Sequence, residues 1–97
     1  MWKTVTNRDA SGVHITASFE SRAPFDELQA LTGYNKLASA LRSAQVCPSA
    51  TESMLESYKR TCLRLLGEEV LIYSARFVCH FNPPRAHLFE VQAVRHG

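Results

Sequence analysis

Cysteine and histidine are the residue types in this chain that could perform nucleophilic catalysis or bind a metal. The histidines of the last third of the chain lack the closely spaced ligand pairs that are typical of zinc sites. Cys79 and His80 are neighbours in an expected strand, where successive side chains point to opposite faces. They are therefore poorly placed to share one metal ion. We expect no metal site and no bound cofactor.

Cys47 is the thiol best placed for catalysis, because it precedes an expected helix and a helix N-terminus lowers a thiol pKa. Cys62 and Cys79 fall in apolar patterns and are expected in the core. The chain contains no nucleophile elbow, phosphate-binding loop or dinucleotide fingerprint. We therefore predict that the protein is not an enzyme and name no catalytic residue. A small accessory enzyme is the least supported alternative.

Length and composition indicate one folded domain over residues 1–97, with 45% hydrophobic and 21% charged residues. The net charge of +2 neither requires nor excludes a nucleic-acid partner. Three cysteines do not form a disulfide framework, and no segment is long and apolar enough to span a membrane. The first residues do not resemble a secretory signal. We expect a cytoplasmic protein without a membrane partner.

Residues 71–81 alternate strictly between apolar and mixed side chains, which predicts a strand with one apolar face. A last strand is expected over 87–95. Its apolar side chains share the core face only if Phe77 lies opposite Val91 and Arg76 lies opposite Gln92. A second hairpin is expected from 2–6 and 13–19. The favoured register has Trp2 facing Ala17 and the core, and a slip of one residue would instead send Trp2 outward and bring Val5 in.

Three helices are predicted between the hairpins. The first covers 24–32 and ends at Gly33, and the second covers 36–45 with Asn35 as its cap. The third follows a capping box formed by Ser49 and Glu52 and ends at Gly67.

The predicted fold class is α+β. The order is strand–strand–helix–helix–helix–strand–strand, which gives a four-stranded antiparallel sheet from two hairpins at the chain ends. The three helices pack on one face, and the other face is at least partly open.

The outer face of the C-terminal strand pair is the predicted functional surface, because it is more apolar than an ordinary solvated face. Arginine in particular anchors protein interfaces. The predicted protein-binding residues are Ile72, Arg76, Val78, His80, Leu88 and Glu90. We expect a small protein-binding module whose partner is a second copy of itself, a larger assembly or a target that it inhibits.

The main alternative is nucleic-acid binding by a degenerate helix-turn-helix at residues 25–45. Its second helix would carry Asn35, Lys36 and Arg42 on its polar side. An RNA-binding sheet is less consistent with the pattern, because Phe77 and Phe81 are expected on the core side and not on an exposed stacking surface.

Overall fold

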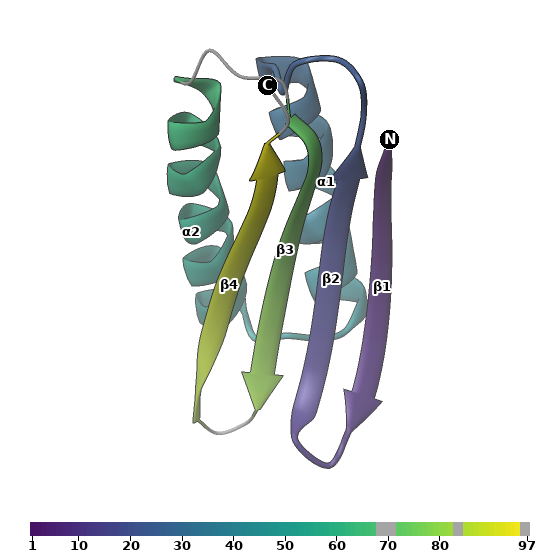
Figure 1. Ribbon diagram of the computed structural model, residues 1–97. Helices are drawn as coiled ribbons and strands as arrows, with labels where there is room; N and C mark the ends of the chain where they lie inside the picture. Colours follow the sequence, from purple (N-terminus) through teal and green to yellow (C-terminus); the bar gives the residue numbers. More distant parts are fainter. Residues whose placement is uncertain (68–71, 83–84, 96–97) are drawn as a thin grey trace.

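The computed structural model describes residues 1–67, 72–82 and 85–95, and of 85–95 it describes the backbone alone. The elements are β1 (Trp2–Asp9), β2 (Gly12–Glu20), α1 (Glu27–Ser43), α2 (Pro48–Leu66), β3 (Ile72–Asn82) and β4 (Arg85–Arg95). The strands pair antiparallel in the order β1-β2-β3-β4. Both helices lie on one face of this sheet (Figure 1). The chain is thus a small α+β domain with an antiparallel sheet.

The predicted fold class is wrong in its helical layer, which contains two helices and not three. The expected break at Gly33 does not occur, because α1 continues through it. Gly33 is buried, and a Cβ atom there would lie 2.3 Å from Cζ2 of Trp2 and 2.3 Å from the hydroxyl of Tyr58. The glycine therefore lets two rings approach the helix backbone and does not end the helix.

The N-termini of both helices also differ from prediction. Asp26 is the N-cap of α1 and accepts a hydrogen bond from the backbone N–H of Gln29 at 2.8 Å. At α2 the N-cap is Cys47, whose side chain makes no capping hydrogen bond to the helix backbone, and Pro48 is the first helical residue. The predicted capping box is wrong because Pro48, which suits the first helical position, starts the helix earlier.

The hairpin of β1 and β2 is longer than predicted, and its turn contains only Ala10 and Ser11. Gly12 closes this turn with φ +126°, and a Cβ there would lie 2.3 Å from the carbonyl oxygen of Phe81. Trp2 lies opposite Phe19, two residues from the expected register. A shift of two residues keeps the same face, so Trp2 is buried as predicted.

The pairing of β3 with β4 confirms two register predictions: Phe77 lies opposite Val91, and Arg76 lies opposite Gln92. The register shifts between Ile72 and Ser74. On the far side of this shift Ile72 is fully buried, so its predicted place on the outer face is wrong. Leu71, predicted at the start of the strand, lies outside the described residues.

The core lies between the sheet and the helices and centres on Trp2. Its ring is 5.5 Å from that of Phe19 and 5.7 Å from that of Phe77, centroid to centroid. The indole N–H donates to the carbonyl of Gln29 at 2.9 Å, and the hydroxyl of Tyr58 donates to the carbonyl of Ala30 at 2.6 Å. These contacts hold α1 and α2 on the inner face of the sheet.

Candidate functional site

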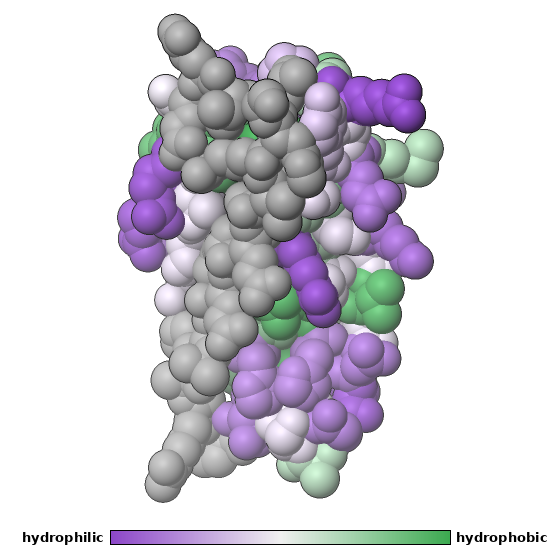
Figure 2. Space-filling model, viewed as in Figure 1, coloured by the Kyte–Doolittle hydropathy of each residue, from purple (hydrophilic) through white to green (hydrophobic). Residues whose placement is uncertain are grey.

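The opposite face of the sheet carries the candidate site. We call it the outer sheet face and define it by Lys3, Val5, Asn7, His14, Thr16, Ser18, Glu20, Ser74, Arg76, Val78 and His80. None of these side chains is buried, and no described helix lies over them. Figure 2 views this face beside the grey residues and shows hydrophilic side chains with small hydrophobic patches between them. The described part of the face is therefore open and mixed in character.

Strand register arranges the outer sheet face in rows that cross the strands. One row contains Lys3, Ser18 and Arg76, the next Val5, Thr16 and Val78, and the next Asn7, His14 and His80. The first row carries two cationic side chains, the second consists of β-branched side chains, and the third contains two histidines. Because neighbouring strands are spaced about 4.8 Å apart, the backbone positions of Lys3 and Arg76 are about 10 Å from each other, on either side of Ser18.

Three of the predicted protein-binding residues, Arg76, Val78 and His80, lie together on this face. The backbone of β4 continues their rows, with Glu90 opposite Val78 and Leu88 opposite His80. The side chains of Glu90 and Leu88 are outside the described part of the chain, so their contribution stays a prediction.

A stacked histidine pair marks one end of the face and was not anticipated from the sequence. The rings of His14 and His80 are 4.3 Å apart and inclined by 5°. Nε2 of His80 donates to the carbonyl oxygen of Ser11 at 2.7 Å, since a carbonyl can only accept. The alternation of β2 puts His14 on the polar side, but only the pairing of β2 with β3 shows which residue it meets.

The turn beside this pair is closed by Asp9 and Ser11. The hydroxyl of Ser11 donates to Oδ1 of Asp9 at 2.5 Å, and this bond, with one from the Ser11 N–H, holds the Asp9 pKa below its usual value. Nε2 of His14 lies 2.9 Å from the same hydroxyl. Because the Ser11 hydrogen points to the carboxylate, His14 is not positioned as a base for a serine nucleophile. The cluster orders the turn and fixes the histidine rings.

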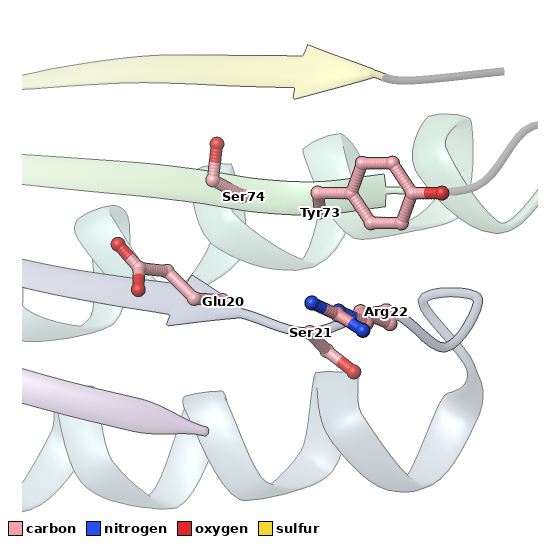
Figure 3. A pocket seen from close by; sticks show the side chains of 5 residues that line it. All are labelled: Glu20, Ser21, Arg22, Tyr73 and Ser74. Carbon is pink, nitrogen blue, oxygen red and sulfur yellow. The ribbon is translucent and has the colours of Figure 1, made fainter.

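A polar hollow of about 700 Å³ adjoins the other end of the outer sheet face, where β2 ends and β3 begins. It is lined by Glu20, Ser21, Arg22, Tyr73 and Ser74 (Figure 3). The backbone N–H of Ser21 donates to the carbonyl of Tyr73 at 2.8 Å, which ties the chain after β2 to β3. Glu20 and Ser74 are opposite each other in the register, so the hollow is continuous with the face.

The residues of the nucleic-acid alternative, Asn35, Lys36 and Arg42, are all exposed on α1. Asn35 is inside the helix and caps nothing. The helix-turn-helix predicted at 25–45 is wrong, because residues 27–43 form one uninterrupted helix. A turn between two helices is what lets the second helix enter a DNA groove. Nucleic-acid binding through these side chains stays an untested prediction.

The thiols divide into one exposed and two buried groups. Cys47 is exposed, and its hydrogen bond with the Ser49 hydroxyl at 3.6 Å is the main cause that lowers its pKa. Burial raises the pKa of Cys62 to about 11 and that of Cys79 to about 12. Within residues 1–67, 72–82 and the backbone of β4, no three acidic, histidine or cysteine side chains gather as metal ligands. Neither described helix is long and apolar enough to cross a membrane.

Fold and site together define a small α+β domain with an antiparallel sheet, one face of which no described helix covers. Comparison of the chain with protein families, with curated proteins and with solved structures finds no match. Its function is therefore argued from the geometry of the described residues.

Proposed function

We propose that the protein is a non-enzymatic protein-binding module that contacts its partner through the outer sheet face. The observation that carries the proposal is the order of rows on this face. The row of Val5, Thr16 and Val78 lies between a cationic row and a histidine row, and no described element covers it. Apolar area rimmed by polar groups is typical of protein interfaces.

The shape of the face favours a macromolecular partner. Thr16, Ser18 and Val78 are short side chains on neighbouring strands in the middle of the face, which favours a flat contact. A second sheet or a flat helical surface can pack on such strands, at about 10 Å for a sheet. The candidate site therefore suits a broad, flat contact.

The charges of the face indicate what the partner presents. Lys3 and Arg76 lie in one row and are both exposed. Arg76 offers a planar donor that can bind a carboxylate through two hydrogen bonds. We therefore expect carboxylates on the partner opposite this row, and small apolar side chains opposite Val78. Arg76 and Val78 act as the polar and apolar anchors.

The test compares two variants of the face with a variant of the helical layer. Val78→Glu places a charge in the centre of the proposed contact, and Arg76→Glu reverses the anchor. Ser39→Glu adds the same charge at an exposed position of α1, away from the sheet. Proteins captured from host cells by each variant are identified by mass spectrometry, and the affinity of the captured partner is then measured with purified components.

We expect the unmodified protein and Ser39→Glu to bind the same partner, and Val78→Glu to lose it. Arg76→Glu should weaken binding at least about tenfold, with a reduced dependence on salt. Circular dichroism must show that both sheet variants remain folded. If folded Val78→Glu and Arg76→Glu retain the partner with unchanged affinity, the outer sheet face is not the binding surface.

A further inference from the structure

An apolar groove runs between α1 and α2 on the side of the molecule opposite the outer sheet face. It encloses about 480 Å³ and is lined by Glu27, Ala30, Leu31, Tyr34, Tyr58, Lys59, Cys62, Leu63 and Leu66. Leu31 and Leu63, on its two walls, are 56% and 70% exposed, and Leu28, one turn before Leu31 in α1, is 67% exposed. These are most of the large hydrophobic side chains exposed in the described residues, and the outer sheet face does not use them.

Contacts between α1 and α2 hold the floor of the groove. Tyr58 is buried, and its hydroxyl donates to the carbonyl of Ala30 across the groove at 2.6 Å. Its ring centroid lies 6.3 Å from that of Tyr34. Burial raises the pKa of the Tyr58 hydroxyl, which therefore stays a neutral donor. A floor fixed in this way offers a preformed surface, so little ordering opposes the docking of a partner.

The two ends of the groove carry opposite charges. Lys59 marks the basic end, where its ammonium lies 5.2 Å from the ring centroid of Tyr34. Glu27 marks the acidic end. It precedes Tyr34 by seven residues in α1, so it lies about 10 Å along the helix axis from the ring that Lys59 contacts. Glu56 is 3.4 Å from Lys59, but this pair is half exposed and contributes little. The Lys59 ammonium can therefore exchange the Glu56 carboxylate for a carboxylate of another molecule.

We infer that the groove is the interface of a symmetric dimer, and that its occupant is the same groove of a second copy. A two-fold axis that lies in the interface plane and crosses the groove exchanges its ends. It brings Glu27 of each copy towards Lys59 of the other and places Leu31 and Leu63 in the centre. A two-fold interface must be complementary to itself, and a groove with an acidic end, an apolar middle and a basic end meets that requirement.

The dimer leaves the outer sheet face free, so this inference does not depend on the proposed function. We expect a weak dimer, because the exposed apolar part of the groove consists of a few leucine side chains and standard interfaces bury roughly 800 Å² per partner. Analytical ultracentrifugation of the full chain should show reversible dimers. Leu63→Glu should remain monomeric over the same concentrations, whereas Val5→Glu on β1 should dimerise like the unmodified protein.

Charge reversal tests the symmetry of the contact. Glu27→Lys and Lys59→Glu should each weaken dimerisation about tenfold, and the double variant should restore it to within about threefold. Because Glu27 and Lys59 lie on different helices and at opposite ends of the groove within one copy, such recovery reports contact between copies. A monomer at all concentrations overturns the inference, as does a dimer that persists in Leu63→Glu. A dimer broken by Val78→Glu and not by Leu63→Glu would assign self-association to the outer sheet face instead.

Discussion

The indole ring of Trp2 lies directly against the backbone of Gly33. A Cβ atom at Gly33 would lie 2.3 Å from Cζ2 and 2.6 Å from Cε2 of that ring. The same indole donates its N–H to the carbonyl of Gln29, one turn earlier in α1. The first residues of β1 and the middle of α1 are therefore joined by a contact that only glycine permits.

Gly33→Ala is expected to destabilise the protein. The alanine would gain about 1 kcal/mol of helix propensity. Displacing a buried indole from a packed core costs about 1–3 kcal/mol or more, and we expect this cost to exceed the gain. The net loss of unfolding free energy should be about 1–2 kcal/mol by urea titration, with the slope of the transition unchanged.

Gly67→Ala is the matched control, because among the described residues a Cβ there would lie nearest to the carbonyl oxygens of Leu63 and Arg64, at 3.6 and 3.8 Å, and the residue has φ −78°. It should be neutral or slightly stabilising. If Gly33→Ala is as stable as Gly67→Ala, the close packing of Trp2 on α1 is incorrect.

Gly33 also shows why the helical layer was mispredicted. A glycine followed by Asn35 and Lys36 is a typical helix boundary, and local propensity favours a break. The burial of Trp2, which is distant in the sequence, outweighs that preference. Leu37 and Leu41 are buried at helical spacing, whereas Leu28 and Leu31 in the first two turns are exposed, so the sequence indicated the buried face of this helix only in part.

The candidate site was predictable to the extent that alternation determines a face. Arg76, Val78 and His80 share the outer face because strand periodicity is strict within a regular pair. Ile72 was misplaced because a shift in register interrupts that periodicity, and nothing in residues 70–74 indicates one. The stacking of His14 on His80 depends on β2 pairing with β3, a contact between residues 66 positions apart. No local pattern encodes that partner.

Arg8 should stabilise the end of α1. Its Nη2 donates to the carbonyl of Ala44, the C-cap of that helix, at 2.7 Å. A cation at the C-terminus also interacts favourably with the helix dipole. Arg8→Ala should therefore lower the unfolding free energy by about 1 kcal/mol, measured by urea titration at low salt.

Lys3→Ala is the control, because it removes an exposed cation from the opposite face of the same strand. It should change the unfolding free energy by less than about 0.5 kcal/mol. Equal effects of the two substitutions would mean that Arg8 does not cap the helix.

The buried thiols predict a loss of stability at alkaline pH. In the unfolded chain both ionise near pH 9.0, whereas burial raises the folded-state pKa of Cys62 to about 11 and of Cys79 to about 12. As pH rises, the thiols of the unfolded chain lose their protons before those of the folded protein. The stability that the two buried thiols provide is therefore complete below pH 9 and declines as pH rises towards their folded-state pKa values. Each thiol can lower the free energy of unfolding by up to about 1.4 kcal/mol per pH unit in this range. Unfolding free energies under reducing conditions should thus fall by about 2–3 kcal/mol between about pH 8 and pH 10.

Cys79→Ala should show roughly half that decline, whatever its stability at neutral pH. Cys47→Ser should not reduce the decline, because the pKa of that exposed thiol is lowered in the folded state. An identical pH dependence in Cys79→Ala and the unmodified protein would show that Cys79 ionises as readily in the folded protein as in the unfolded chain.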